Sequence, residues 1–235
     1  MKVFVGWDVR ERLAFEVCRH SILSRTRSAA VRALDEAELR ACGLFTRPKL
    51  PGERWDVLSG APYATDFALT RFLVPVLMKG RGWALFCDAD FLFTAPLDEL
   101  FALADPSKAV MVVPHAFPLR EVEKMDGRAQ QPYPRKWWSA LMLWNCGHPS
   151  NEPRAMLSRV NEWPGRDLHG FRWLADHEIG RLPDTWHWLE GYSEPTAEPP
   201  AAIHFTRGGP WFPTWQHVAH ADLWRREHDR MAVSL

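Results

Sequence analysis

Short runs of hydrophobic residues recur along the first half of the chain, and segments with helical spacing separate them. Runs of this length are typical of buried strands, whereas hydrophobic positions three and four residues apart indicate an amphipathic helix. The pattern predicts strands at residues 3–7, 31–34, 83–87 and 109–113, and helices at residues 10–24, 66–78 and 97–104. Strands that alternate with helices indicate an α/β domain with a largely parallel sheet.

The helix expected at residues 66–78 contains a helix breaker. Thr65 is a suitable N-cap, and glycines follow the segment at positions 80 and 82. Pro75 lacks a backbone N–H, so we expect a kink there or an end near Val74. Residues 42–62 hold three prolines and three glycines and are expected to be irregular.

The second half of the chain has fewer regular patterns. We expect strands at residues 139–144 and 202–205, helices at 173–179 and 217–231, and a polar loop at 124–137. No stretch has the composition of a flexible linker, so residues 1–235 are expected to form a single domain.

Composition and charge exclude several classes of protein. The chain has 235 residues, of which 46% are hydrophobic, and this length can bury a core without disulfides. Lys plus Arg and Asp plus Glu total 29 each, so the net charge is zero and we expect no nucleic-acid partner. The four cysteines show no disulfide or zinc spacing. We recognise neither a signal peptide nor an integral membrane segment, and we expect a cytoplasmic protein.

The first segment with candidate metal-binding residues is 83–93, WALFCDADFLF. Asp88 and Asp90 stand two residues apart at the carboxyl end of a predicted strand, so both side chains point to one side of the sheet. Ligands of open α/β sheets collect at such strand ends. Partial burial of two carboxylates costs free energy unless a cation offsets their charge. The pair therefore predicts a Mg²⁺ or Mn²⁺ site. The alternative is a turn that the two aspartates cap.

A second segment, IHFTRGGPW at residues 203–211, has features that fit the same site. His204 precedes a flexible turn, and an imidazole as third ligand favours Mn²⁺ over Mg²⁺. Gly208 and Gly209 would let backbone N–H groups approach phosphate oxygens, and Arg207 is suited to a bidentate phosphate contact. The alternative for His204 is a core histidine satisfied by its neighbours.

These segments together resemble the retaining glycosyltransferases of family 8, over nearly the whole chain. The matching segments are FVGWD at 4–8, TRF at 70–72, DAD at 88–90, WNCG at 144–147, DHE at 176–178, and HF with PW at 204–211. The last segment is one residue shorter than usual and lacks a lysine before Pro210. His177 stands where the family usually has glutamine.

The resemblance implies a GT-A fold, which is Rossmann-like, and a divalent metal held by Asp88, Asp90 and His204. It also implies a nucleotide half at residues 1–115 and a sugar and acceptor half at 116–235. Binding of the nucleotide sugar is implied for Asp8, Arg71, Asp88, Asn145, Arg207, Gly208 and Gly209. Asp176, His177 and Glu178 are implied to act at the anomeric carbon, with Asp176 the better nucleophile candidate. The alternative for Asp176 is an acid on a helix surface or one that only forms hydrogen bonds.

The activity implied is that of a hexosyltransferase. It would transfer a sugar from a UDP-sugar to a hydroxyl of a carbohydrate or other acceptor, with retention at the anomeric carbon and with Mn²⁺ or Mg²⁺. Tyr133, Trp137 and Trp138 are aromatic residues suited to shape the acceptor mouth, and the alternative is that they serve packing alone.

Two other functions stay open at this point. A non-catalytic module would bind the nucleotide or sugar without turnover. A haloacid-dehalogenase-like phosphohydrolase would use the first aspartate as a nucleophile. That motif normally continues with Thr or Val and lies near the N-terminus, whereas this chain has Leu92 and places the motif mid-chain.

Overall fold

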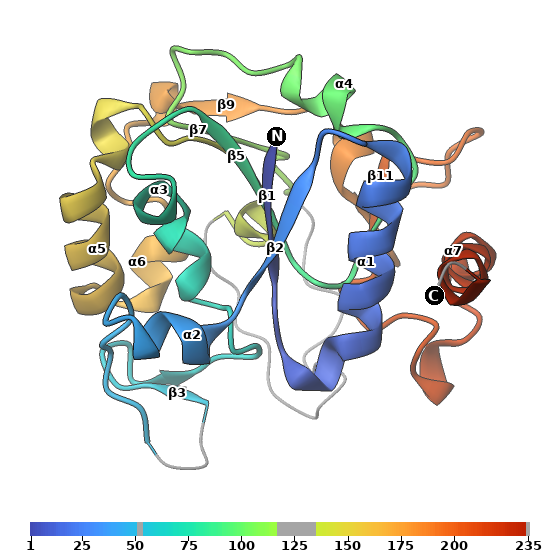
Figure 1. The fold of residues 1–235 in the computed structure, drawn as a ribbon, viewed down its shortest axis with the longest axis horizontal. Helices are drawn as coiled ribbons and strands as arrows, with labels where there is room; N and C mark the ends of the chain where they lie inside the picture. The colour runs from blue at the N-terminus through green and yellow to red at the C-terminus, as the bar shows by residue number, and fades with distance from the viewer. Residues whose placement is uncertain (51–53, 117–134, 234–235) are drawn as a thin grey trace.

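The structure is a computed structural model, which describes residues 1–50, 54–116 and 135–233. A six-stranded sheet with the order β2-β1-β5-β8-β7-β9 lies at its centre (Figure 1). Its strands are β1 (Lys2–Gly6), β2 (Ala30–Leu34), β5 (Trp83–Cys87), β7 (Val110–Val112), β8 (Leu141–Asn145) and β9 (Ile179–Arg181). Strand β8 runs antiparallel to both neighbours, and the other pairs are parallel. The predicted α/β class with a mostly parallel sheet is confirmed.

A smaller sheet continues from the end of β5. It has the order β10-β11-β6 and consists of β6 (Phe91–Phe93), β10 (Trp188–Leu189) and β11 (Ala202–His204). Only three residues separate β5 from β6, so the turn at 88–90 joins the two sheets. Strands β3 (Trp55–Asp56) and β4 (Ala61–Pro62) pair in the segment that was expected to be irregular.

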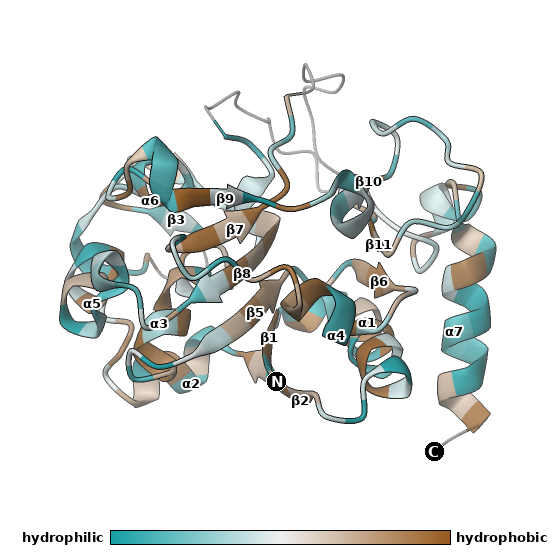
Figure 2. Ribbon diagram, turned by 90° about the horizontal axis from the view of Figure 1, so that it is seen from above, coloured by the Kyte–Doolittle hydropathy of each residue, from teal (hydrophilic) through white to brown (hydrophobic). Residues whose placement is uncertain are grey.

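Helices cover both faces of the central sheet (Figure 1). Helix α1 (Arg12–Arg25) lies on one side, and α7 (Ala221–Val233) packs outside it. On the other side lie α2 (Glu36–Ala41), α3 (Val74–Leu77), α5 (Pro153–Glu162) and α6 (Gly165–His169). Helix α4 (Leu97–Phe101) follows β6. Figure 2 shows hydrophobic residues along the central strands and hydrophilic ones on the outer helices. Burial of each large apolar side chain contributes about 1.5–3 kcal/mol.

Several short 3₁₀ segments lie in the described ranges. They are η1 (Val9–Glu11), η2 (Thr70–Leu73), η3 (Trp138–Ala140), η4 (Pro149–Asn151), η5 (Asp176–Glu178), η6 (Asp184–His187) and η7 (Pro213–Trp215). No helix in this part of the chain is long and apolar enough to cross a membrane.

Two of the predicted helices are wrong in extent or type. In place of one helix at 66–78, the chain forms η2 and then the short helix α3, and Thr65 caps neither. Pro75 lies in the first turn of α3, where a missing N–H costs nothing. In place of a helix at 173–179, the chain forms η5 and then β9, because Ile179 pairs with Val110 in the sheet.

Candidate metal site and its surroundings

The turn between β5 and β6 holds both aspartates in place. The N–H of Asp88 donates to the carbonyl of Ala140 at 2.9 Å, and the N–H of Phe205 donates to the carbonyl of Asp90 at 3.0 Å. Ala89 between them is fully buried. Both backbone contacts fix the direction of the carboxylates at the point where the two sheets meet.

Strand β11 brings His204 to this turn. It pairs antiparallel with β6, so that His204 lies opposite Phe91, and the two rings stack with centroids 4.5 Å apart. The Nε2 atom of His204 lies 3.2 Å from Oδ1 of Asp90. Ligand atoms of Asp88, Asp90 and His204 all lie within 4.8 Å of one another. Two carboxylates and one imidazole are a suitable set of ligands for a divalent ion such as Mn²⁺, and here they lie close together. The residues therefore fit the implied metal.

A second histidine, which the sequence interpretation missed, supports His204. His187 in η6 is fully buried, and its Nε2 lies 2.8 Å from Nδ1 of His204. Burial, and then the neighbouring His115 and His204, hold the pKa of His187 well below its ordinary value. Burial also lowers the pKa of His115 to about 4. His187 and His115 are therefore neutral at pH 7.

Arg71 is one of the predicted residues that the structure does bring to the aspartates. Its guanidinium lies 2.8 Å from Oδ1 of Asp88 and donates to the carbonyl of Ser139 at 2.8 Å. It also lies over the rings of Phe67 and Phe86, in a buried position at the base of η2. A fixed positive charge therefore lies next to the candidate metal ligands.

A cavity of about 220 Å³ opens in front of these residues. Its lining comes from the β1–α1 turn, the segment before η2, the β5–β6 turn and the end of β11. The lining residues are Arg10, Glu11, Ala64, Thr65, Phe67, Asp88, Asp90, His204, Thr206 and Phe212. The predicted metal ligands thus face a cavity whose lining comes mostly from residues 1–115.

Asp8 does not line this cavity, contrary to the expected contact with a nucleotide base. Its carboxylate is fully buried and accepts hydrogen bonds from the side chain of Arg10 at 2.8 and 3.1 Å. Burial alone would raise the pKa of Asp8, but the bonds from Arg10 outweigh it and the pKa is lowered. Asp8 therefore positions Arg10, which does line the cavity.

The turn after β11 is built differently from the expected phosphate cradle. Arg207 forms a two-point contact with the buried Glu190, at 3.0 and 2.9 Å. The N–H of Gly208 already donates to the carbonyl of Phe205 at 2.9 Å. A Cβ on Gly209 would lie 1.9 Å from the ring of Trp211, and one on Gly208 would lie 2.6 Å from Trp215. The glycines are needed for packing against tryptophan.

Asn145 is not at the site. Strand β8 runs antiparallel to β5, so Asn145 pairs with Trp83 at the start of β5, and its amide donates to the carbonyls of Pro106 and Lys108. Five strand residues, or about 17 Å, separate that level from Asp88. The end of β8 that reaches the site is Leu141, opposite Cys87.

Asp176, His177 and Glu178 are likewise placed away from the aspartates. They precede β9, whose first residue is level with Ala84 through Val110 and Trp144. Three strand spacings and four residues along the sheet separate Ile179, at the start of β9, from Asp88, which is a distance on the order of 20 Å. Asp176 is paired with Arg135, and Glu178 accepts from the N–H of Ala175 at 2.7 Å. Asp176 and His177 are exposed, and the structure does not bring the three residues to the metal ligands.

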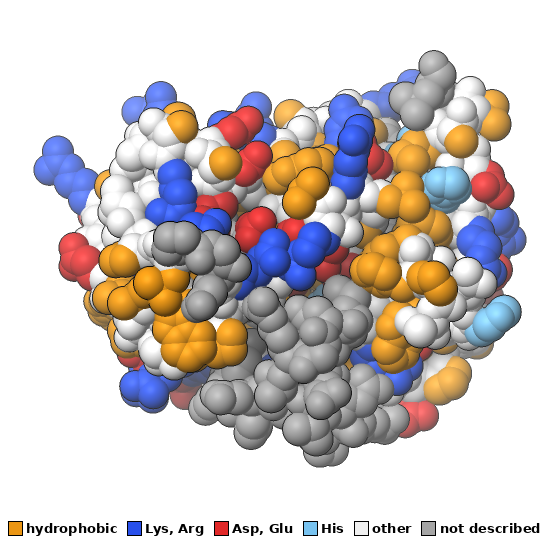
Figure 3. Space-filling model, turned by 90° about the horizontal axis from the view of Figure 1, so that it is seen from below, with side chains coloured by type: hydrophobic (Ala, Val, Ile, Leu, Met, Phe, Trp, Pro, Cys, Tyr) orange, Lys and Arg blue, Asp and Glu red, His pale blue; other side chains and the backbone are white. Residues whose placement is uncertain are grey.

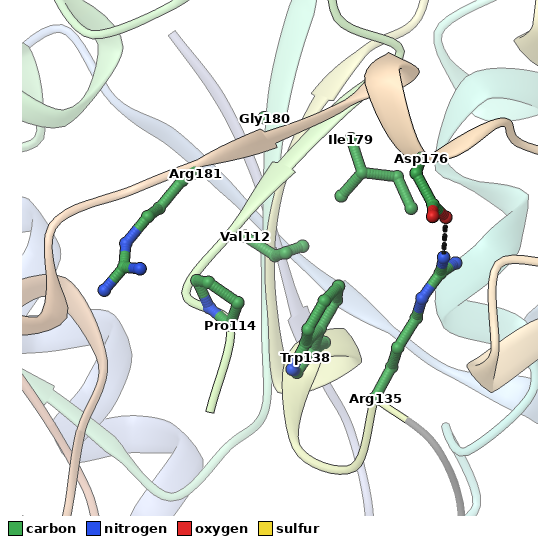
Figure 4. Close-up of a pocket in the computed structure, with 8 residues that line it drawn as sticks. All are labelled: Val112, Pro114, Arg135, Trp138, Asp176, Ile179, Gly180 and Arg181. Atoms are coloured by element: carbon green, nitrogen blue, oxygen red, sulfur yellow. Dashed lines mark hydrogen bonds and ion pairs between the residues drawn. The ribbon is translucent and has the colours of Figure 1, made fainter. Parts of the chain in front are cut away.

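A second cavity, of about 380 Å³, contains Asp176 (Figure 4). Trp138 lies at its centre, with the Arg135–Asp176 pair on one side and Arg181 on the other (Figure 4). The indole of Trp138 donates to the carbonyl of His115 at 3.0 Å. Trp137 is buried against Tyr192 and does not line the cavity, and Tyr133 lies outside the described residues.

Solved structures with the same arrangement of strands and helices are glycosyltransferases. The WbbM bifunctional glycosyltransferase matches with a TM-score of 0.65 and 14% identity, GlyE of Streptococcus pneumoniae TIGR4 with 0.61 and 12%, and the galactosyltransferase LgtC with 0.59 and 15%. The matches cover 97%, 97% and 98% of this chain, and 49%, 59% and 96% of those chains. The chain thus spans about half the length of WbbM. The fold is the GT-A type of glycosyltransferases.

The sequence itself has a relative among characterised proteins. Protein CDI of Arabidopsis thaliana is 42% identical over 232 residues, which cover 96% of this chain and 85% of that protein. The chain belongs to the family of Protein CDI. No family model matches the sequence.

Proposed function

We propose that the chain transfers a sugar from a nucleotide diphosphate sugar, a UDP-sugar, to an acceptor hydroxyl with retention at the anomeric carbon. The observation that carries this proposal is the convergence of Asp88, Asp90 and His204 on one point beside a cavity in a GT-A fold. Membership of family 8 and the hexosyl nature of the donor stay predictions of the resemblance.

In this proposal Asp88, Asp90 and His204 would hold the divalent ion, with Mn²⁺ preferred because of the imidazole. The bound ion would supply Lewis-acid stabilisation of the negative charge on a diphosphate leaving group. Arg71 lies 2.8 Å from Asp88 and offsets part of the negative charge of the two aspartates before a donor binds. Arg10 lines the same cavity and is held by Asp8, so it is placed to bind a phosphate.

We propose the cavity around Trp138 for the acceptor. The half-buried indole of Trp138 lines this cavity and suits contact with a sugar ring, and Arg135 and Arg181 lie on either side of it. A chain of contacts links this cavity to the metal site. Trp138 donates to the carbonyl of His115, the ring of His115 packs on His187, and His187 contacts His204. Asp176 would then act on the acceptor side. The division into a nucleotide half and a sugar and acceptor half agrees with this placement and stays a proposal.

The test is release of UDP from a panel of UDP-sugars, with Mn²⁺ and with a chelator. Asp90→Asn should reduce Mn²⁺-dependent UDP release by at least about 100-fold, since it removes charge stabilisation at the leaving group. Asp229→Asn is the matched control, because that carboxylate is 80% exposed on α7. Wild-type rates for Asp90→Asn would show that the ion is not held there.

The same assay separates the two alternatives. A non-catalytic module would bind UDP with Mn²⁺ but release none from any UDP-sugar. A phosphohydrolase of the haloacid-dehalogenase type would release phosphate from p-nitrophenyl phosphate. The fold and the site argue against that second alternative, because the solved structures with this fold are glycosyltransferases and Asp88 is paired with Arg71.

A further inference from the structure

Glu11 is a buried acid at the candidate metal site to which the proposed mechanism gives no role. It lies in the turn between β1 and α1, where its residue is only 4% exposed. Its side chain lines the same cavity as Asp88, Asp90 and His204. A carboxyl group in this position faces three groups that are themselves suited to bind a cation.

The other acids around the cavity each have a close cationic or imidazole partner, whereas Arg10 acts on Glu11 only through its charge. Asp8 pairs with Arg10 at 2.8 Å, Asp88 with Arg71 at 2.8 Å, and Asp90 lies 3.2 Å from His204. Within the described part of the chain, no hydrogen bond or ion pair holds the carboxyl of Glu11. A mostly buried carboxyl without a hydrogen-bond partner reduces stability, since it loses much of its contact with water and gains no hydrogen bond in exchange.

The electrostatics agree with this geometry. Burial, and then the negative charges of Asp90, Asp8 and Asp88, raise the pKa of Glu11 to about 8. A leucine or glutamine would fill the same space without this cost. An acid at this position in the cavity wall is most simply explained by a cation that binds in front of it.

We propose that Glu11 is a further acidic group of the divalent-cation site, and this rests on the proposed function of that site. The group of ligand atoms within 4.8 Å of one another comprises Asp88, Asp90 and His204 without Glu11. Glu11 therefore acts from a second position, through water bound to the ion. Divalent ions such as Mg²⁺ and Mn²⁺ keep water ligands in proteins, and carboxylates that bond to those ligands strengthen binding.

The test is a titration of the full chain with Mn²⁺, with free Mn²⁺ measured by electron paramagnetic resonance. Glu11→Gln should weaken Mn²⁺ binding by about 10-fold, the lower end of the range for residues behind the direct ligands. The Tm of the metal-free variant should be no lower than that of the wild type, because the carboxyl has no partner to lose. If Glu11 had a purely structural role, Glu11→Gln would bind Mn²⁺ as tightly as the wild type and would have a lower metal-free Tm.

Two further variants complete the experiment. Glu11→Asp keeps a carboxylate and should bind Mn²⁺ more tightly than Glu11→Gln, which tests the charge even where one variant folds poorly. Glu36→Gln is the matched control, because Glu36 is also 4% exposed but pairs with Arg40 and Lys49 away from the cavity, and its Mn²⁺ affinity should equal the wild type.

The outcomes separate a failure of the Glu11 inference from a failure of the metal site itself. If the wild type binds Mn²⁺, Asp90→Asn does not, and Glu11→Gln binds with the wild-type Kd, the inference on Glu11 is wrong and the metal site stands. If the wild type itself binds no Mn²⁺, the proposed metal site of Asp88, Asp90 and His204 is wrong. Glu11 then has no cation to bind.

Discussion

His204 is held from both sides of its ring. Its Nδ1 atom lies 2.8 Å from His187, and its Nε2 atom lies 3.2 Å from Asp90. In a neutral imidazole one ring nitrogen donates and the other accepts. The contact with His187 therefore engages Nδ1 and leaves Nε2 for Asp90 or a cation. Partners of this kind orient histidine ligands and fix which nitrogen faces the metal.

We predict that His187→Ala weakens Mn²⁺ binding by about 10-fold, because His204 loses the contact that orients it. His187→Gln should recover part of the affinity, since its amide can both donate to and accept from Nδ1 of His204. The measurement is a Mn²⁺ titration at a temperature well below the Tm of each variant.

His228→Ala on α7 is the control for this experiment, because that side chain is 37% exposed. An unchanged Mn²⁺ affinity in His187→Ala would mean that the stacking of His204 on Phe91 orients the ring by itself.

At the scale of elements, α7 is tied to α1 through one buried acid. Glu227 is 2% exposed and accepts from Arg25 at 2.8 Å, and it lies 2.7 Å from Nδ1 of His20. Burial alone would raise the pKa of Glu227, but the contacts with Arg25 and His20 outweigh it and lower the pKa below 4.5. The ionised form is therefore the one that stabilises the helix pair.

We predict that Glu227→Gln lowers the free energy of unfolding at pH 7 by about 2 kcal/mol, the size typical of hydrogen bonds to a charged group. A group with a lowered folded pKa stabilises above its unfolded pKa and loses this contribution as pH falls through the folded pKa. The difference in free energy of unfolding between the variant and the wild type should therefore be largest at pH 7 and should decrease below about pH 4.5. Urea unfolding at both ends of this range measures it.

Glu38→Gln is the control for Glu227, since Glu38 is 63% exposed in a surface pair with Arg32. Its effect should stay below about 1 kcal/mol at every pH. A pH-independent loss in Glu227→Gln would assign the effect to packing of α7 and not to charge.

The positions of most strands could be predicted from the sequence, but their directions could not. The hydrophobic run at 83–87 coincides with β5, and the run at 139–144 overlaps β8. A hydrophobic run carries no information on whether a strand runs parallel or antiparallel to its neighbour. Because β8 is antiparallel, Asn145 lies at the opposite end of the strands from Asp88, and the structure does not bring it to the predicted metal ligands.

The candidate site was predictable where its residues follow a strand directly. Asp88 and Asp90 follow β5, and His204 ends β11, so local pattern and burial were sufficient. Glu11 and His187 depend on how a turn and a 3₁₀ segment fold against distant strands. The only local signals were an acid just after Asp8 and a histidine between two tryptophans, Trp186 and Trp188, and neither signal is specific.

At the scale of the whole molecule, the site lies where several parts of the chain meet. The cavity takes residues from the β1–α1 turn, the segment before η2, the β5–β6 turn and the end of β11. On one face, acidic and basic side chains gather in the middle between hydrophobic areas (Figure 3). A ligand in the cavity would contact both sheets at once, so its binding should stabilise the fold as a unit.

We predict that Mn²⁺ and UDP together raise the Tm of the wild type by about 5–10 °C at about 100 times Kd, where binding adds about 2.7 kcal/mol. UDP with a chelator should have little effect, because the diphosphate would then face Asp88 and Asp90 without an intervening cation. Asp90→Asn should lose the joint shift while its metal-free Tm stays near the wild-type value. An equal shift with UDP and chelator would mean that the nucleotide binds at a point other than the two aspartates and His204.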